Sequence, residues 1–291
     1  MAADSTFEER LERVRLIATD LDGTLVNSHD EISERNVRAL RAAMDRGYWV
    51  SFLTGRSMHG LDRVSSVIEA NAPVVCSNGA QVASGDRAIV FSQRFIGEQT
   101  VRDLVAYLLS EGVDFVIRSD AGELISDNPH HPVLRGRRKS GEEDDDPYER
   151  TPHVSDPTDS RLGALDVVKV MVMLGGCPTD AVNRVESYCS KDDRLGFTKS
   201  ADDLLEVAPA GTDKGTGLRK VCEVVGIDRD ECLVFGEYDN DVPGFDVAGI
   251  GVCMRNGSEA AKAHADLVCP SNDEDGVGEY IERHLLRGVG R

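Results

Sequence analysis

Short apolar runs alternate with amphipathic stretches in the N-terminal part of the chain. The runs 16–19, 48–53 and 73–76 have the length and composition of strands buried on both faces. Between them, apolar residues recur at helical spacing, first behind Ser33, which has the side chain of an N-cap, and again from Leu61 onward. Because strands that alternate with helices usually pair in parallel, this order predicts a parallel sheet with helices on its faces.

The pattern changes after about residue 80. A helical stripe over 101–108, a hairpin over 113–126 and a strand at 165–174 follow without the earlier alternation. Residues 127–164 are rich in Pro, Asp and Arg, and we expect a solvated, partly disordered loop there. This mixed pattern predicts an α+β domain, residues 83–207, inserted into the first domain.

Alternation returns near residue 209. A helix is predicted from Lys214, and a last one over 276–286. Short strands are predicted between them, at 232–235, 250–254 and 266–269. We therefore expect an α/β fold, in which residues 1–82 and 208–291 form a doubly wound parallel sheet that carries the α+β insertion.

Composition narrows the class of partner. The chain has 291 residues, enough for two domains, and 40% of them are hydrophobic, as in ordinary globular proteins. Its formal net charge of −19 disfavours nucleic acid and anionic membranes as partners. The 7 cysteines show no Cys-x-x-Cys spacing and several lie in apolar runs, which indicates free thiols in a reducing compartment.

The sequence shows no targeting or membrane segment. Residues 1–15 are polar and charged, unlike a signal peptide. The apolar stretch from Leu165 to Leu174 is too short to span a bilayer and contains Asp166 and Lys169. We therefore expect a cytoplasmic protein.

Two carboxylates follow the first predicted strand. Asp20 and Asp22 are two residues apart, and in an extended segment such residues point the same way. Close carboxylates repel each other unless a cation or a shared proton lies between them, and Mg2+ prefers oxygen ligands. An Asp after a strand also serves as a turn former or a helix cap, so this motif alone leaves both interpretations open.

Further polar clusters follow other predicted strands. Thr54-Gly55-Arg56 comes after the second strand, and Glu237 to Asp241 follows the strand at 232–235. Ligands of open parallel sheets bind at the carboxyl ends of the strands, where these clusters fall. Lys214 opens a helix, whose N-terminus adds to its positive charge. Together these clusters supply carboxylates for a metal, donors for phosphate oxygens and one ammonium. Such a site suits the binding and reaction of a phosphate monoester.

At this point the chain resembles the haloacid dehalogenase superfamily, and within it the Cof-type phosphatases with a type IIB inserted cap. The segments that carry the resemblance are Asp20-Leu-Asp-Gly-Thr24, Thr54-Gly-Arg56, Lys214-Gly-Thr-Gly217 and Gly236-Glu-Tyr-Asp-Asn-Asp241. Ser77-Asn-Gly-Ala80 and Ser271-Asn-Asp-Glu-Asp-Gly-Val277 add to it. The resemblance spans most of the chain, apart from about residues 127–164.

The resemblance implies the catalytic roles. Asp20 is expected to attack phosphorus and form an aspartyl-phosphate, while Asp22 protonates the leaving alcohol and then deprotonates the attacking water. Lys214 is expected to neutralise nucleophile and phosphate, because an anion that attacks an anion needs positive charge nearby.

The resemblance also implies the ligands. Thr54, the Gly55 amide, Lys214 and Asn240 are expected to bind phosphate; Arg56 is either a further phosphate ligand or a structural ion pair. Mg2+ is the expected cofactor. Its expected ligands are the Asp20 side chain, the Asp22 backbone carbonyl and Glu237, and Asp241 is expected to support the water molecules bound to the ion.

Glu237 is a departure from the family pattern. The family usually has Asp at this position, and Glu places its carboxylate one methylene further out. Since Mg2+ demands near-ideal octahedral geometry, the longer arm is expected to change affinity or rate. We favour ligation by Glu237 over loss of metal binding.

The sequence thus predicts a Mg2+-dependent phosphatase of small phosphorylated metabolites, with specificity in the cap. One alternative is a phosphosugar mutase that uses the same aspartyl-phosphate. Another is a non-catalytic phosphometabolite-binding protein, which we consider because Glu237 replaces the usual Asp. The sequence names neither the substrate nor the oligomeric state.

Overall fold

The chain divides into two compact units. The computed structural model describes residues 6–127, 151–177 and 179–286. One unit comprises Met1–Gln93 and Thr212–Arg291, and the other is Arg94–Gly211. The two units are called here the core unit and the inserted unit.

Both boundaries of the insertion differ from the sequence prediction. The sequence placed them after residues 82 and 207, whereas the structure places them after Gln93 and Gly211. The strand β5 (Val90–Gln93) was assigned to the insertion, but it pairs with β4 (Gln81–Ala83) of the core unit. At the other end, β11 (Leu204–Pro209) pairs with β10 (Leu195–Ala201) of the inserted unit as far as Pro209.

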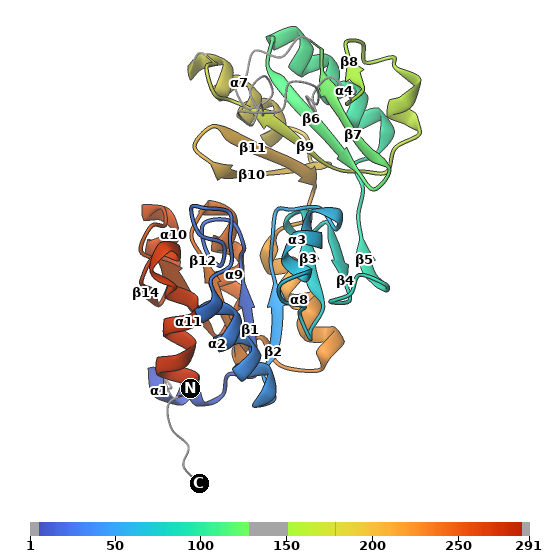
Figure 1. Cartoon of the computed structure of the whole chain (residues 1–291). Helices are drawn as coiled ribbons and strands as arrows, with labels where there is room; N and C mark the ends of the chain where they lie inside the picture. The colour runs from blue at the N-terminus through green and yellow to red at the C-terminus, as the bar shows by residue number, and fades with distance from the viewer. Residues whose placement is uncertain (1–5, 128–150, 178, 287–291) are drawn as a thin grey trace, which may run out of the picture. The chain divides into compact units, whose positions relative to one another are not determined.

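The core unit is built on a parallel sheet of five strands in the order β14-β13-β12-β1-β2 (Figure 1). Its strands are β1 (Leu16–Thr19), β2 (Trp49–Phe52), β12 (Cys232–Gly236), β13 (Ile250–Met254) and β14 (Leu267–Cys269). All four neighbouring pairs are parallel. The predicted doubly wound α/β fold is therefore confirmed. Because β1 is flanked by β2 and β12, the carboxyl ends of these three strands are adjacent.

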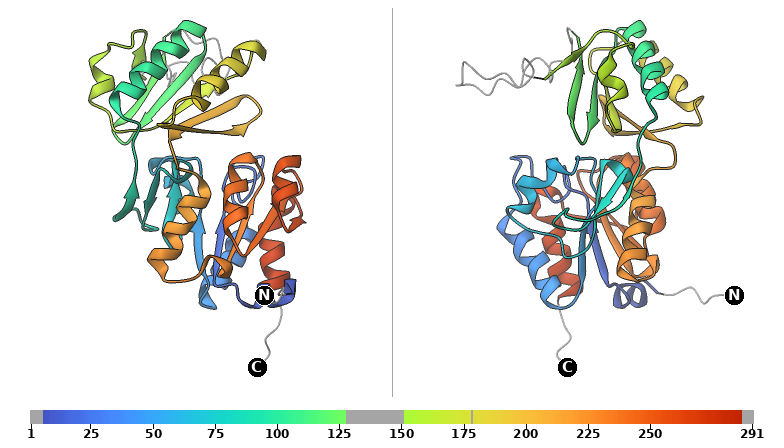
Figure 2. Two further views of the ribbon diagram at one scale, coloured as in Figure 1. Left: turned by 180° about the vertical axis from the view of Figure 1, so that it is seen from behind. Right: turned by 90° about the vertical axis from the view of Figure 1, so that its right-hand side faces the viewer.

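Helices cover both faces of this sheet (Figures 1 and 2). Those on one face are α2 (Glu34–Asp45), α3 (Asp62–Ser65) and α11 (Gly276–Tyr280), and the terminal helix α1 (Phe7–Glu12) also packs against this core. Those on the other face are α8 (Lys214–Val225), α9 (Val242–Val247) and α10 (Glu259–His264). Alternate residues of each strand point into these two cores, so that Ile17 lies in one and Leu16 and Ala18 in the other.

Helix ends follow local sequence signals. Ser33 caps α2 as predicted, since its side chain accepts a hydrogen bond from the Asn36 N–H. The helix predicted from Leu61 is short, with a 3-10 turn at His59–Leu61 before α3. The last predicted helix is α11 followed by a π-helical turn, Ile281–Leu285.

The third predicted strand does not continue the parallel sheet, although it begins next to it. β3 (Val74–Cys76) meets the end of β2 through one parallel bridge, Leu53 with Val75. It then pairs antiparallel with β4, which in turn pairs with β5, so that the three form a separate small sheet.

The inserted unit is an α+β layer. Its sheet has the order β10-β11-β9-β6-β7-β8, antiparallel except for the pair β7 and β8. The strands not yet defined are β6 (Asp114–Ser119), β7 (Gly122–Ser126), β8 (His153–Val154) and β9 (Val167–Met173). Helices α4 (Glu98–Glu111) and α7 (Thr179–Ser190) share one hydrophobic core with this sheet. The hairpin predicted over 113–126 is β6 and β7. The loop predicted over 127–164 falls largely outside the described residues, although β8 lies within it.

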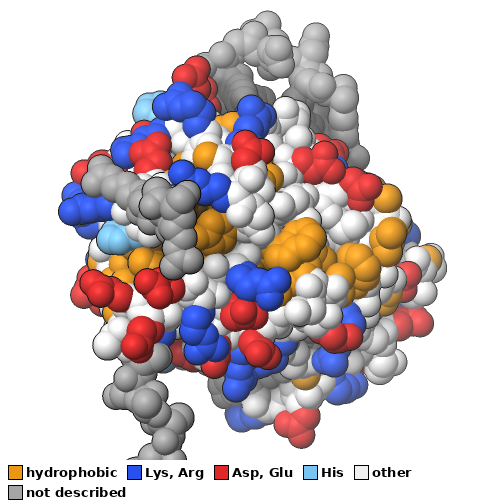
Figure 3. Space-filling view, turned by 90° about the horizontal axis from the view of Figure 1, so that it is seen from below, with side chains coloured by type: hydrophobic (Ala, Val, Ile, Leu, Met, Phe, Trp, Pro, Cys, Tyr) orange, Lys and Arg blue, Asp and Glu red, His pale blue; other side chains and the backbone are white. Residues whose placement is uncertain are grey.

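The surface carries both signs of charge. On the face shown in Figure 3, acidic and basic side chains are interspersed around small apolar areas. All 7 cysteines are free thiols, as predicted. No helix among the described residues is both long and apolar enough to cross a membrane.

Candidate active site

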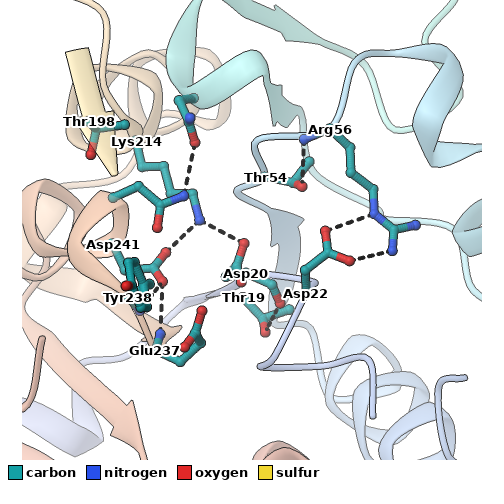
Figure 4. Close-up of polar contacts among 12 residues, drawn as sticks. Thr19, Asp20, Asp22, Thr54, Arg56, Thr198, Lys214, Glu237, Tyr238 and Asp241 are labelled. Atoms are coloured by element: carbon teal, nitrogen blue, oxygen red, sulfur yellow. Dashed lines mark hydrogen bonds and ion pairs between the residues drawn. The ribbon is translucent and has the colours of Figure 1, made fainter. Parts of the chain in front are cut away.

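Asp20 lies where the central strand of the core unit ends. It directly follows β1, and its N–H donates to the carbonyl of Phe235 on the neighbouring β12 at 2.9 Å. The residue is only 5% exposed. Its Oδ1 accepts a hydrogen bond of 2.6 Å from Lys214 Nζ (Figure 4). The predicted nucleophile is therefore buried, oriented by the sheet and paired with an ammonium.

Lys214 reaches this position because α8 begins there. Asp213 caps the helix by accepting from the Thr216 N–H, so Lys214 is the first helical residue. Its Nζ donates to Asp20 Oδ1 and to Asp241 Oδ1, both at 2.6 Å. Burial alone would lower the pKa of Lys214, but the Asp20 and Asp241 carboxylates outweigh it and the pKa is raised. Lys214 is thus held as a buried cation.

Asp241 closes the loop that follows β12. Its Oδ2 accepts hydrogen bonds from the backbone N–H groups of Glu237 at 2.8 Å and Tyr238 at 3.1 Å. Gly236 is required beside it, because a Cβ at this position would lie 2.4 Å from the Asp241 carboxyl carbon. These contacts bring Glu237 back toward Asp20.

Three carboxylates converge at this point. Asp20, Glu237 and Asp241 each offer an oxygen, and these oxygens lie within 4.8 Å of one another. Burial raises the pKa of Asp20 to about 7; Lys214 opposes the rise, while Asp241 and Asp22 add to it. Burial, then the charges of Asp20 and Asp241, raise the pKa of Glu237 to about 8. Three acids share one ammonium, so this oxygen-only donor set fits a hard divalent cation.

Among the described contacts, the Asp22 carboxylate binds Arg56 and not Lys214. β1 ends at Thr19, so Asp20 and Asp22 both lie just beyond the strand. The Asp22 carboxylate forms a bidentate pair with Arg56, at 2.9 Å from Nε and 2.5 Å from Nη2 (Figure 4). Its side chain is 61% exposed.

Arg56 takes the second of the two roles considered for it. Its guanidinium binds Asp22 and also approaches Asp30, at 3.5 Å. The Asp22 hydrogen bond outweighs partial burial and raises the pKa of Arg56. In this structure Arg56 is an ion-pair partner of the predicted general acid.

Two further predicted phosphate ligands, Thr54 and Asn240, are buried. Thr54 follows β2 fully buried, and its Oγ1 accepts from the Arg56 N–H at 3.0 Å, which leaves its own hydrogen to donate. Asn240 is buried and its Nδ2 donates to Asn78 Oδ1 at 3.2 Å. Gly55 lies between Thr54 and Arg56.

Asn78 is a residue that the sequence analysis did not assign to the site. It has a positive φ of 51° and its N–H donates to the Thr54 carbonyl at 3.0 Å. The signal was the Asn78-Gly79 pair after the third strand, which was interpreted only as part of the family pattern. Gly79 is required here, because a Cβ would lie 2.1 Å from the Asp213 carbonyl oxygen.

Comparison with known proteins gives the family. The family model of the haloacid dehalogenase-like hydrolases matches residues 17–281. The chain belongs to this family. One relative is YwtE of Bacillus subtilis, a 5-amino-6-(5-phospho-D-ribitylamino)uracil phosphatase. Its sequence is 26% identical to this one, and the match covers 94% of this chain and 99% of YwtE. The chloroplastic endoribonuclease YBEY of Arabidopsis thaliana is 29% identical over 93% of this chain, which spans only 46% of that protein.

Solved structures agree on the fold of this haloacid dehalogenase-like hydrolase. The HAD subclass IIB sugar phosphatase BT4131 superposes with a TM-score of 0.76 at 21% identity, over 92% of this chain and 98% of that one. The predicted family and the predicted enzyme class, a phosphoric monoester hydrolase, are confirmed. The roles of the individual residues stay predictions.

Proposed function

We propose that the protein hydrolyses small phosphate monoesters, such as sugar phosphates, through an aspartyl-phosphate on Asp20 and with Mg2+ as cofactor. The observation that carries this proposal is the buried Asp20 carboxylate, bonded to Lys214 at 2.6 Å within a cluster of three acids. An anionic nucleophile next to a fixed ammonium suits attack on an anionic phosphate group.

In the first step, an Asp20 oxygen forms a bond to phosphorus and the bond from phosphorus to the ester oxygen breaks. Asp22 gives its proton to that oxygen, so the alcohol leaves neutral. In the second step, water loses a proton to Asp22 and attacks the same phosphorus. The bond between phosphorus and Asp20 then breaks, which releases inorganic phosphate and regenerates the Asp20 carboxylate.

The chain offers a defined set of ligands for the cation. Asp20, Glu237 and Asp241 supply carboxylates, and the backbone carbonyl of Asp22 is a further expected ligand. Bound Mg2+ would supply the positive charge that three acids and a phosphate require in addition to Lys214. We assign phosphate binding to Thr54, the Gly55 amide, Lys214 and Asn240.

The small-metabolite substrate class follows from the relatives. The Bacillus subtilis relative is a phosphatase of a ribityl phosphate, and the similar fold belongs to a sugar phosphatase. We assign the choice of leaving group to the inserted unit, Arg94–Gly211, in the role of the cap. The core unit holds the groups proposed for the chemistry.

The direct test is phosphate release from p-nitrophenyl phosphate, followed by a library of sugar and nucleotide phosphates. We expect turnover with MgCl2 and none with a chelator, and free phosphate rather than an isomerised sugar phosphate as product. No release with any substrate or divalent cation would contradict the proposal.

Mg2+ is expected to stabilise the fold more at pH 8 than at pH 5. The pKa values of Asp20 and Glu237 are raised from 3.8 to about 7 and from 4.5 to about 8. Between about pH 4 and pH 8 the folded state therefore holds protons that the unfolded state releases, so cation-free stability falls as pH rises. A bound cation offsets this loss, whereas protons compete with it at pH 5. Differential scanning calorimetry is expected to show a Tm rise of about 5 °C at pH 8 and much less at pH 5.

The control for this measurement is NaCl at matched ionic strength, which should not reproduce the shift. An Mg2+ effect of equal size at both pH values would contradict the proposed cluster.

Arg56→Ala is expected to lower kcat by about tenfold with little effect on Tm. The change frees the Asp22 carboxylate to leave its position, and misplacement of a reacting group by about 1 Å costs up to about 100-fold. Stability changes little because the Asp22 side chain is 61% exposed, and such pairs contribute about 0–1 kcal/mol. Steady-state kinetics and thermal melting give both values.

A matched control is Arg63→Ala, since Arg63 pairs with Asp30 and not with Asp22 among the described contacts. Equal kinetic effects of the two changes would argue against a specific role of Arg56.

A further inference from the structure

A segment that follows β13 bonds to both acidic loops of the site. The Ser258 N–H donates to the Glu237 carbonyl at 2.8 Å, and Ser258 Oγ donates to Asp239 Oδ1 at 2.9 Å. Two residues earlier, Asn256 Nδ2 donates to the Gly23 carbonyl at 2.8 Å. Residues 256–258, called here the bridging segment, therefore connect the turn after β1 with the loop after β12.

Asn256 has a second bond that fixes its amide. Its Oδ1 accepts from the Asn272 N–H at 3.1 Å. Asn272 in turn donates through Nδ2 to the Val26 carbonyl at 3.0 Å, and Asn36 Nδ2 donates to the Leu25 carbonyl at 3.3 Å. Three asparagine amides thus bind the carbonyls of residues 23, 25 and 26. The carbonyl that Asn256 binds, that of Gly23, is the nearest of the three to Asp22 in sequence.

The turn that Asn256 holds is closely fitted. Gly23 has a φ of +76°, and a Cβ there would lie 3.1 Å from the Glu237 side chain. The Gly23 carbonyl belongs to the peptide between Gly23 and Thr24, one residue beyond Asp22, so a displacement of this turn shifts the Asp22 backbone as well. The Arg56 guanidinium binds the Asp22 carboxylate directly. Asn256 instead holds the backbone of the next residue, Gly23.

We propose that Asn256 is a positioning residue for Asp22: its amide donates to the Gly23 carbonyl and so holds the general acid in line with the leaving oxygen. The proposal rests on the proposed function, because only an acid–base role of Asp22 makes its position matter for rate. Asn256 is exposed, so replacing it removes these hydrogen bonds without opening a cavity in the core. Its effect is therefore expected on the chemistry and not on folding.

The test compares two substrates whose leaving groups differ in their need for a proton. Phenyl phosphate releases a phenol with a pKa of about 10, whereas p-nitrophenolate is far more stable as the anion. For Asn256→Ala we expect kcat on phenyl phosphate to fall by about tenfold and kcat on p-nitrophenyl phosphate by no more than about twofold. KM is expected to change little for either substrate, since Asn256 does not belong to the proposed phosphate ligands.

A second variant separates the two bonds of Asn256. Asn256→Asp keeps the acceptor for the Asn272 N–H but removes the donor to Gly23. We expect it to reproduce the loss on phenyl phosphate. The matched control is Asn183→Ala, an exposed asparagine on α7 of the inserted unit, which should leave both rates unchanged.

Hydrogen exchange followed by mass spectrometry supplies a readout that does not need turnover. Amides of residues 21–27 are expected to exchange faster in Asn256→Ala than in the wild type or in Asn183→Ala. Unchanged exchange, equal losses on both substrates, or wild-type kinetics of Asn256→Asp would each overturn the proposal. A wild type that hydrolyses no phosphate ester would instead refute the proposed function, and the exchange result would still decide whether Asn256 holds the turn.

Discussion

Replacing Asp20 by Asn is expected to abolish phosphate release, with a fall in kcat of about 10⁴-fold or more. The amide is nearly the same size as the carboxylate, but it is neutral and a poor nucleophile. No other described carboxylate is bonded to Lys214 in the same way except Asp241, whose Oδ2 is already occupied by two backbone N–H groups. Phosphate release from p-nitrophenyl phosphate measures the loss.

The same substitution is expected to leave the fold intact. Asp20→Asn removes one of three clustered acids, two of them buried, and thereby reduces their repulsion. Tm without Mg2+ should therefore be unchanged or higher. The matched control is Asp246→Asn, which affects a solvent-exposed partner of His264 and should retain activity. Residual activity of Asp20→Asn within about tenfold of the wild type would contradict its role as nucleophile.

Replacing Lys214 by Met is expected to damage both stability and activity. The side chain is fully buried between Asp20 and Asp241, so the change leaves two carboxylates without a counter-charge. Breaking a buried ion pair in this way costs about 3–5 kcal/mol. Activity should fall by at least about 10³-fold, because the charge that stabilises nucleophile and phosphate is lost. Urea unfolding and steady-state kinetics measure the two effects.

The same helix offers the control. Lys220→Met removes a lysine of α8 that is partly exposed and pairs with Glu223, and it should change the free energy of unfolding by less than about 1 kcal/mol. The double variant Asp20→Asn with Lys214→Met should be more stable than Lys214→Met alone, because one uncompensated acid is gone. A Lys214→Met variant as stable as the wild type would contradict the charge balance described for the site.

The sequence predicts the sheet well because its signals are local. The apolar run 16–19 becomes β1 without change, and the Ser33 cap starts α2 at the predicted place. The rule that parallel strands present ligands at their carboxyl ends placed Asp20, Glu237 and Asp241 at one edge of the sheet, and Lys214 was expected from its position at a helix start. The structure brings these four side chains together.

What escaped prediction depends on geometry that no local pattern records. The pair of Asp22 with Arg56 joins two loops that are 34 residues apart in the sequence. The strand β5 was assigned to the insertion because the alternating pattern stops near residue 80, although β5 pairs with the neighbouring β4 of the core unit. Asn256 contacts a turn more than two hundred residues away, and its own neighbourhood carries no motif of an acid–base site.

The order of strands in the core sheet has a consequence for biosynthesis. β1 lies between β2, which follows soon after it in the chain, and β12, which follows only after the whole inserted unit. As the ribosome extends the chain, the contiguous inserted unit can close its own contacts while β1 still lacks its second neighbour, β12. Lys214 and Glu237 join Asp20 only after residues 212 onward have emerged. The centre proposed for the chemistry is therefore expected to be among the last parts of the protein to form during translation.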